Sequence, residues 1–180
     1  YIPPQSLTGG LTVTEGTTLS IPVAYRAVQL ISDSIGSLSF GAHRDDERLD
    51  PTPAVLRQPD PNQTRMETIG ATVTSLVMRG NAYFILGNRD RFGFPQSAIL
   101  LSPDAVGVVI DRQGNISYQV NGTTYDTSEI LHIRGGVVTP GSISGAGPLQ
   151  LQRRSLALSL AGDEAASESH VSGSIPSGVI

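Results

Sequence analysis

Hydrophobic and polar positions follow a helical period most clearly in residues 64–80. Thr64 and Glu67 have the spacing of a capping box, in which each side chain satisfies a backbone donor at the start of a helix. Gly80 tolerates a left-handed backbone and is therefore suited to end the helix. The apolar positions recur every three or four residues and predict one buried face: Met66, Ile69, Val73, Leu76 and Val77. The opposite face is expected to carry Arg65, Glu67, Thr72, Thr74 and Arg79.

A β-prone apolar run, residues 82–86, follows this helix after Asn81 alone. Its composition predicts a buried strand rather than a second helix. Because the connection is so short, strand and helix should pack together. We expect either Tyr83 and Ile85 or their alternates Phe84 and Leu86 to contact Ile69, Val73 and Leu76.

An earlier amphipathic helix is predicted for residues 20–35, with Ser20 as its cap and Pro22 near its first position. Its apolar face would hold Ala24, Ala27, Val28, Ile31 and Ile35. Its polar face would hold Arg26, Gln29, Ser32 and Asp33. Residues 37–40 then alternate as a half-buried strand, and residues 54–57 can form a short helical turn between prolines.

Short β-prone segments separated by turn residues fill the middle of the chain. We expect strands over 97–101, 106–111, 116–120 and 123–125, with Asn121-Gly122 as a strong hairpin signal. Residues 126–129 can cap a single helical turn before an extended segment over 130–134. The predicted fold class is therefore α+β, with helices packed on a small, mainly antiparallel sheet.

The two ends of the chain have a different character. Residues 1–19 are rich in Pro, Gly and Thr and predict an extended arm, which either packs on a neighbouring subunit or is a disordered terminus. Residues 20–180 are assigned to one domain. Pro148 is expected to open a long helix to about Val171. The chain stops on Val179-Ile180, in what reads as the start of a strand, so we expect a fragment or an incomplete chain.

Composition limits the classes of function. The chain has 180 residues, 38% of them hydrophobic, no cysteine and a formal charge of −4. Disulfides and thiolate metal sites are excluded, and no apolar run is long enough to predict a membrane span or a signal peptide. The acidic balance argues against a large surface for binding duplex DNA, which needs clustered positive charge.

Candidate chemistry is sparse. The histidines at positions 43, 132 and 170 lack the spacing of metal ligands, and the glycine-rich residues 135–147 match no phosphate-binding or nucleophile motif. His132 is either a catalytic base or a hydrogen-bonded structural histidine, and we favour the structural reading. We therefore predict no catalytic residue, no cofactor and no metal site, and expect that the protein is not an enzyme.

Seven short segments together resemble the N-terminal portion of portal (connector) proteins of long-tailed bacteriophages. In chain order they are IPVAY (21–25) through LIS (30–32), PDPN (59–62), RGNAY (79–83), LSPD (101–104), ILHIRG (130–135), GAGPL (145–149) and PSGVI (176–180). Each segment alone is weak evidence, but their shared order over residues 20–180 makes the resemblance specific.

The resemblance implies a structural protein that forms a ring, typically a dodecamer, at one vertex of the virion capsid, through which DNA is packaged and ejected. Implied partners are the major capsid protein, the scaffold, the terminase large subunit and head-completion or tail-adaptor proteins, after assembly in the host cytoplasm. This segment would form much of the outer wing domain. The stem, clip and crown would lie elsewhere, so DNA would pass through the channel without being gripped by this segment.

Two other classes stay open without the resemblance: an unrecognised hydrolase and a soluble α+β interaction module. A hydrolase would need a reactive constellation of side chains. A monomeric module would need no ring, and the mass of the native particle separates it from a portal.

The predicted C-terminal helix carries charges in an order that opposes its dipole. Arg153 and Arg154 lie in its first half, whereas Asp163 and Glu164 lie in its second half, with Glu168 beyond them. An isolated helix prefers the reverse order. Either the order is chance, or these four residues are subunit-interface candidates that meet opposite charges on a neighbouring subunit.

Overall fold

The computed structural model describes residues 14–171. The chain divides into two compact units, one formed by Tyr1–Arg26 with Leu151–Ile180 and the other by Ala27–Gln150. Each unit is described by itself. Residues 1–13 of the expected arm and the expected strand at the C-terminus lie outside the described residues.

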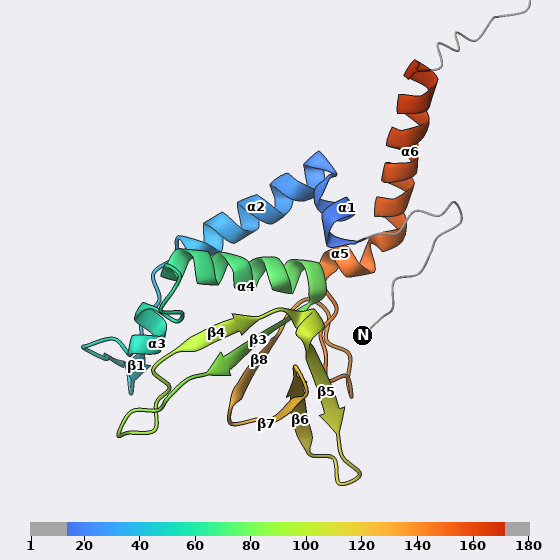
Figure 1. The fold of residues 1–180 in the computed structure, drawn as a ribbon. Helices are drawn as coiled ribbons and strands as arrows, with labels where there is room; N and C mark the ends of the chain where they lie inside the picture. The colour runs from blue at the N-terminus through green and yellow to red at the C-terminus, as the bar shows by residue number, and fades with distance from the viewer. Residues whose placement is uncertain (1–13, 172–180) are drawn as a thin grey trace, which may run out of the picture. The chain divides into compact units, whose positions relative to one another are not determined.

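The larger unit contains two three-stranded antiparallel sheets (Figure 1). One has the order β4-β3-β8, formed by Ala98–Leu101, Asn81–Leu86 and Ile130–Arg134. The other has the order β5-β6-β7, formed by Val106–Ile110, Ile116–Val120 and Thr123–Asp126. Smaller elements are the hairpin β1–β2 (His43–Arg44 and Glu47–Arg48), α3 (Ala54–Arg57) and the 3-10 turn η1 (Pro103–Ala105). The strands predicted between residues 82 and 134 are present, and they form two sheets rather than one.

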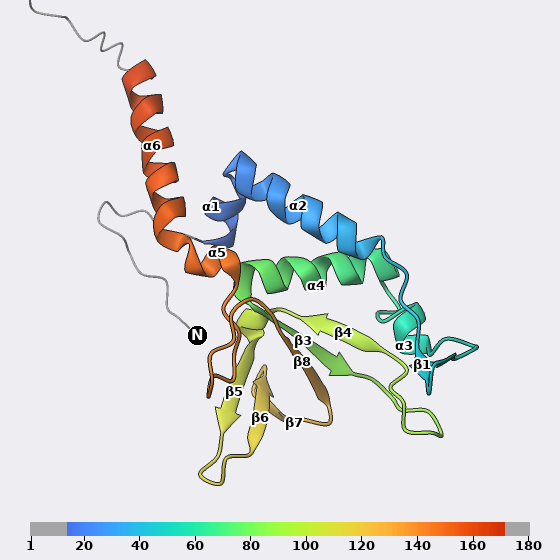
Figure 2. The same cartoon turned by 180° about the vertical axis from the view of Figure 1, so that it is seen from behind.

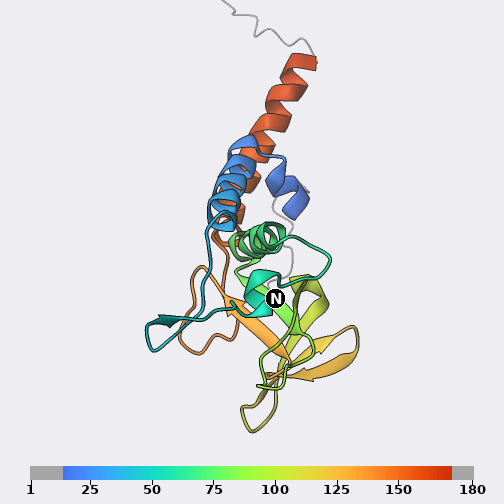
Figure 3. The ribbon, with the colours of Figure 1, turned by 90° about the vertical axis from the view of Figure 1, so that its left-hand side faces the viewer.

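Helix α4 (Arg65–Arg79) confirms the predicted helix and both of its ends. Thr64 and Glu67 form the reciprocal capping box, and Gly80 ends the helix with a φ of 73°. The helix lies along one face of the β4-β3-β8 sheet, and α2 lies beyond it, as Figures 2 and 3 show from behind and along α4. The α+β prediction is therefore correct.

Strand β3 is buried on both faces, which explains its continuous apolar sequence. Phe84 packs with Ala82 and Ala98 in a cluster that also contacts Leu76 and Leu86. Tyr83 faces the opposite way and packs with Tyr118, Val120 and Ile130 between the two sheets. The sequence left open which face of this strand meets the helix. The structure confirms the alternative in which Phe84 and Leu86 face Leu76.

Replacing Leu76 by alanine should therefore destabilise the larger unit. Leu76 is partly buried against the Phe84 cluster, and its Cδ2 would lie 3.0 Å from a Cβ on Gly135. Loss of a leucine side chain from a core costs about 2–5 kcal/mol, and partial burial places this site near the lower limit. Chemical denaturation measures the change; an unaltered unfolding midpoint would show that Leu76 is not part of the core.

The buried faces of the two helices agree only in part with the expected ones. Val73 on α4 is buried as predicted. In α4, Thr68 and Thr72 are buried, whereas Met66 is 49% exposed. The threonine hydroxyls donate to the carbonyls of Thr64 and Thr68, at 3.1 and 2.7 Å, so their methyl groups can be buried without an unsatisfied polar atom.

Helix α2 (Pro22–Gly36) buries a stripe that overlaps the expected one only in part. Ala24 and Val28 are buried as predicted, whereas Ala27, Ile31 and Ile35 are exposed. Ser32, which we expected on the polar face, is buried, and its hydroxyl lies 3.0 Å from that of Thr74 on α4. A Cβ on Gly36 would lie 3.3 Å from the Met66 carbonyl. Small residues thus let the two helices approach closely, and they leave Ile31 and Ile35 exposed.

Three further segments depart from the sequence predictions. Residues 37–40 form no strand, because the helix-terminal turn occupies their first backbone donors and Leu38 and Phe40 remain exposed. Residues 127–129 form a hydrogen-bonded turn rather than a helical one. The long C-terminal helix is broken at Gln152 into α5 (Pro148–Leu151) and α6 (Arg153–Val171).

The smaller unit holds α1 (Glu15–Leu19), the start of α2 and α6. Helix α1 lies within the stretch expected to be an extended arm. Thr14 caps it: its hydroxyl accepts from the Thr17 amide at 3.2 Å, and its own amide donates to the Thr17 hydroxyl at 2.7 Å. This reciprocal cap uses threonine in place of the usual Glu, which is why its pattern was not recognised.

Candidate functional site

The four interface candidates lie on α6. Arg153 is partly buried, whereas Arg154, Asp163 and Glu164 are exposed. With a rise of about 1.5 Å per residue, the arginines and the acids are about 15 Å apart along the helix and do not pair with one another. The structure thus leaves three of these four charges exposed and does not bring the arginines and the acids together.

A polar junction forms where α4 turns into β3. We define it by Asn81, Tyr83, Tyr118, His132 and Gly145, which come from β3, β6, β8 and the loop before α5. Three of the segments that carried the family resemblance, residues 79–83, 130–135 and 145–149, meet there.

Asn81 is the centre of the polar junction. Its amide nitrogen donates to the carbonyls of Arg79 and Gly145, at 3.0 and 2.8 Å. Its carbonyl oxygen accepts from the Gly145 amide at 2.8 Å and lies 3.0 Å from His132 Nε2. All four bonding positions of the buried side chain are therefore used.

These contacts determine the state of His132. Gly145 fixes the orientation of the Asn81 amide, so Oδ1 faces His132 and Nε2 must carry the proton. Nδ1 then accepts from the Tyr118 hydroxyl, 3.4 Å away. The ring also stacks on Tyr83, with 4.3 Å between centroids. Burial first, and then the charge of Arg134, lower the pKa of His132 to about 4.

His132 is therefore a neutral, hydrogen-bonded histidine, as the structural reading predicted. Its two nitrogens are engaged by Asn81 and Tyr118, and neither contacts a nucleophile. Burial also raises the pKa of both Tyr83 and Tyr118, so both rings are neutral. The arrangement can hold segments together but has no group poised for acid–base or nucleophilic catalysis.

Glycines let the loop before α5 reach the end of α4. A Cβ on Gly80 would lie 2.4 Å from the Gly147 amide nitrogen, and a Cβ on Gly145 would lie 2.4 Å from the carbonyl oxygens of Gly135 and Gly80. The Gly135 amide donates to the Gly80 carbonyl at 2.9 Å. The glycine-rich sequence thus serves close backbone approach rather than phosphate binding.

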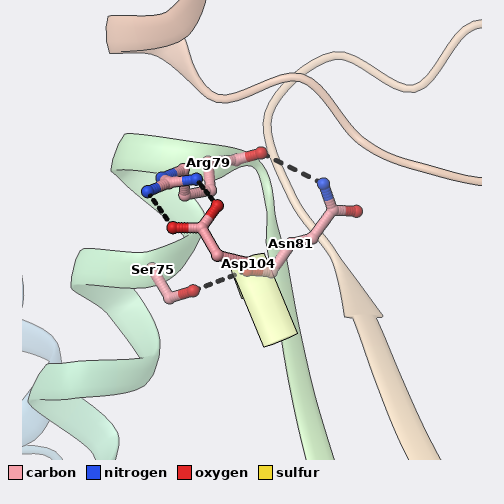
Figure 4. A network of polar contacts seen from close by, with 4 residues as sticks. All are labelled: Ser75, Arg79, Asn81 and Asp104. Carbon is pink, nitrogen blue, oxygen red and sulfur yellow. Dashed lines mark hydrogen bonds and ion pairs between the residues drawn. The ribbon is translucent and has the colours of Figure 1, made fainter. Parts of the chain in front are cut away.

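An ion pair lies beside the polar junction. Arg79 and Asp104 form a two-pronged contact, in which Nη2 donates to Oδ2 at 2.7 Å and Nη1 meets Oδ1 (Figure 4). This contact lowers the pKa of the Asp104 carboxyl. Ser75 donates to the Asn81 carbonyl at 2.6 Å. The end of α4 is therefore tied to η1 as well as to β3.

The remaining histidines and acidic residues form no cluster in the part of the chain that the structure describes. Residues 14–171 contain no group of three or more His, Cys, Asp or Glu side chains arranged to hold a metal ion. His43 on β1 and His170 on α6 are both exposed. In the same range, no helix is long and apolar enough to cross a membrane.

The folding stability of the larger unit should fall as the pH is lowered from about 6.5 to about 4. Over this window the unfolded chain protonates His132 but the folded protein does not, so proton binding favours unfolding. A His132→Gln variant, which can still donate to Asn81, should have a flatter profile there. Urea denaturation between pH 4 and 7 measures this, and identical profiles would contradict the buried neutral histidine.

Sequence reasoning did not identify Asn81 as the centre of a site. The available signal was an asparagine between a helix-ending glycine and a buried strand, at a position where a polar side chain needs partners. Two of those partners, His132 and Gly145, are 51 and 64 positions away in the sequence, which periodicity does not reveal.

Comparisons with known proteins identify the family. A model of the phage portal protein family matches residues 22–180. A probable portal protein of Streptomyces phage phiC31 is 27% identical over 195 residues, covering 95% of this chain and 41% of that protein. The chain thus spans about two-fifths of the length of this relative.

Solved structures share the fold. The HK97-family portal protein from Corynebacterium diphtheriae superposes with a TM-score of 0.67 at 23% identity, over 92% of this chain and 51% of that one. A chain in the neck of an empty gene transfer agent particle gives a TM-score of 0.72 at 23% identity, over 91% and 46% of the two chains. Because the family model covers most of the sequence and the fold agrees, this chain belongs to the phage portal protein family.

Proposed function

We propose that this chain is the N-terminal wing portion of a portal subunit, a structural component of the virion at the capsid vertex where DNA enters and leaves. The single observation that carries the proposal is the family match over residues 22–180. The shared fold over nine-tenths of the chain supports it.

The proposed assembly is a homo-oligomeric ring, with twelve subunits as the expected number. Related chains occur in necks of gene transfer agent particles that were treated with C6 and C12 symmetry. Such rings use a heterologous contact, in which one surface of each subunit meets a different surface of the next.

The proposed partners follow from the same role. They are the major capsid protein, the scaffold, the terminase large subunit and the head-completion or tail-adaptor proteins, with assembly in the host cytoplasm. The formal charge of −4 supports a peripheral position away from the DNA path. We also propose that the chain is not an enzyme, in keeping with a polar junction whose groups are all engaged by one another.

The native mass of the full-length subunit that carries this segment tests the proposal. Native mass spectrometry should give one dominant species whose mass is a multiple of the subunit mass, twelvefold for a dodecamer. A monomer at assembly concentrations would contradict the ring and would favour the soluble interaction module.

For α6, we propose that Arg153 and Arg154 meet carboxylates of a neighbouring subunit. Replacing both by glutamate should impair ring formation at low salt while leaving the subunit folded, because the contact becomes repulsive. The effect should weaken at high salt, which screens exposed charges. Sedimentation at two ionic strengths measures the fraction of subunits in rings. Arg112→Glu, a single charge reversal at a turn, is the control. Normal rings from the Arg153/Arg154 double variant would contradict the proposed contact.

A further inference from the structure

The β3–β4 and β5–β6 hairpins carry the same five-residue turn at their tips, with the pattern D-R-x-G-x at residues 90–94 and 111–115. In the first turn, the Asp90 carboxylate accepts from the amides of Phe92 and Phe94, at 2.8 and 2.9 Å. The Asp90 carbonyl accepts from the Gly93 amide at 3.0 Å, and the Asp90 amide donates to the Phe94 carbonyl at 2.8 Å. The side chain and the backbone of Asp90 therefore fix the turn together.

The second turn repeats these four hydrogen bonds. The Asp111 carboxylate accepts from the amides of Gln113 and Asn115, both at 2.8 Å. The Asp111 carbonyl accepts from the Gly114 amide at 3.1 Å, and the Asp111 amide donates to the Asn115 carbonyl at 3.0 Å. The glycines share a left-handed backbone, with a φ of 85° at Gly93 and 88° at Gly114. Polar residues at the third and fifth positions are therefore sufficient to build this turn.

At the same two positions, the first turn carries phenylalanines. Phe92 is 69% exposed and Phe94 is 46% exposed. The guanidinium carbon of Arg91 lies 4.7 Å from the centroid of the Phe92 ring. We call Arg91, Phe92 and Phe94 the aromatic knob. Because the same turn forms with Gln and Asn, the fold does not require these rings, and exposing them to water is unfavourable.

The turn that carries the knob is also braced from outside. Arg89 donates from Nη1 to the Gly93 carbonyl at 2.8 Å and from Nη2 to the Ser128 carbonyl at 2.6 Å. A surface that its own chain covers permanently is ordered by that cover, whereas a surface that is rigid beforehand loses less entropy when a second molecule binds. The bracing therefore favours contact with a separate molecule.

The composition of the knob indicates the chemistry of that molecule. Aromatic and arginine side chains are enriched among the anchors of protein–protein interfaces. Asp90 directs its carboxylate to amides of its own turn, so Arg91 is the charge that the knob offers, and a carboxylate complements it. A single cation does not suit duplex DNA, which needs clustered positive charge. The knob therefore fits an apolar pocket of a protein, edged by a carboxylate.

Polar side chains flank the knob in the same loop: Asn88, Arg89 and Gln96 are all exposed. Obligate contacts between subunits are large and apolar, whereas a small apolar centre with a polar rim is typical of non-obligate contacts. The loop projects past the end of its sheet, away from α2 and α4, where its tip can enter a pocket (Figures 1 and 2). The size of the knob therefore favours a protein that joins the ring after the ring has formed.

We propose that the aromatic knob anchors the portal ring to another protein of the virion, in an apolar pocket edged by a carboxylate. This inference rests on the proposed function and names one surface by which the ring meets its surroundings. The rings of Phe92 and Phe94 would leave water in the pocket, and Arg91 would pair with the carboxylate at its edge.

Hydroxyl-radical footprinting of the full-length subunit reports what covers the knob at each stage of assembly. Oxidation of Phe92 and Phe94 should be equal in unassembled subunits and in isolated rings, and should fall severalfold in DNA-free capsids that contain the ring. Ile110, which is 51% exposed beside the second turn, is the internal control and should not change.

Three other results would each overturn the inference. Protection already present in unassembled subunits would assign the cover to the rest of the same chain. Protection that appears in isolated rings would assign it to a neighbouring copy. Protection found only in DNA-filled capsids would assign it to DNA.

An exchange of turn residues tests the anchor directly. Phe92→Gln with Phe94→Asn gives the first turn the sequence of the second, so the subunit should fold and form rings as before. The fraction of capsids that contain a ring should fall about tenfold or more, as expected when an interface anchor is lost. Circular dichroism checks the fold, and native mass spectrometry checks the ring.

A charge reversal tests the carboxylate at the edge of the pocket. Arg91→Glu should lower the fraction of capsids that contain a ring, more at low salt than at high salt, because the contact becomes repulsive. Arg112→Glu, the same change at the same position of the second turn, is the matched control and should have no effect.

These outcomes separate the inference from the proposed function. Capsids that take up the Phe92/Phe94 variant as often as the wild type would overturn the anchor and leave the portal ring standing. A variant that folds but forms no ring would place the knob in the subunit contact and would also overturn the inference. A wild-type subunit that forms no ring would overturn the proposed function as well.

Discussion

Replacing Asn81 by alanine should lower the free energy of unfolding of the larger unit by about 2–5 kcal/mol. The substitution removes four hydrogen bonds at once and leaves the buried N–H and C=O of Gly145 without their partner. Each buried polar group left unsatisfied costs about 1–3 kcal/mol. His132 also loses the acceptor for its Nε2 proton.

Asn88→Ala is the matched control for this prediction. Asn88 is an exposed asparagine just past the other end of β3, and surface substitutions usually change stability by less than about 0.5 kcal/mol. Urea denaturation of both variants measures the difference. Equal midpoints for the two variants would show that the polar junction does not stabilise the fold.

Alanine substitutions at two glycines of α4, one at its C-terminal cap and one in its middle, should change the stability of the larger unit in opposite directions. Gly80→Ala should destabilise the larger unit by more than about 2 kcal/mol, because its φ of 73° is costly for a residue with a Cβ and because that Cβ would lie 2.4 Å from the Gly147 nitrogen. Neither the backbone of α4 nor the adjoining loop can move without breaking the polar junction.

Gly70→Ala supplies the control in the middle of α4. A Cβ there would meet nothing within 4 Å, so the variant should be stabilised by about 0.5–1 kcal/mol through the higher helix propensity of alanine. Thermal unfolding of the pair separates the two effects. Similar melting temperatures for both variants would contradict the close approach of the loop to Gly80.

The sequence was sufficient to predict the parts of the fold whose signals are local. The capping box at Thr64, the stop at Gly80 and the strand over 82–86 were all correct, because each depends on neighbours within four residues. The hairpin at Asn121-Gly122 was correct for the same reason, and both residues have a positive φ.

The buried faces of the helices were harder to predict, because polar residues were assumed to be exposed. Thr72 and Ser32 are buried because their hydroxyls find hydrogen-bond partners on α4. Met66 was expected on the buried face but is 49% exposed. The polar junction could not be predicted at all. Its hydrogen bonds join Asn81 to residues far along the chain, so only the folded structure brings them together.

The family resemblance and the polar junction have a common structural basis. The segments 79–83, 130–135 and 145–149 read as separate weak motifs in the sequence, but in the structure they meet around Asn81. Their glycines are required for close packing, and their polar residues satisfy one another. These motifs therefore describe a way of holding helix, sheet and loop together rather than a catalytic site.

The most direct test of the central claim is a reconstruction by electron cryomicroscopy of the full-length protein that carries this segment. The account predicts a closed ring with an axial channel, the expected number of subunits being twelve, and with the unit formed by residues 27–150 at its outer wall. A ring in which that unit lines the channel would contradict the wing assignment. Particles without rotational symmetry would contradict the portal function itself.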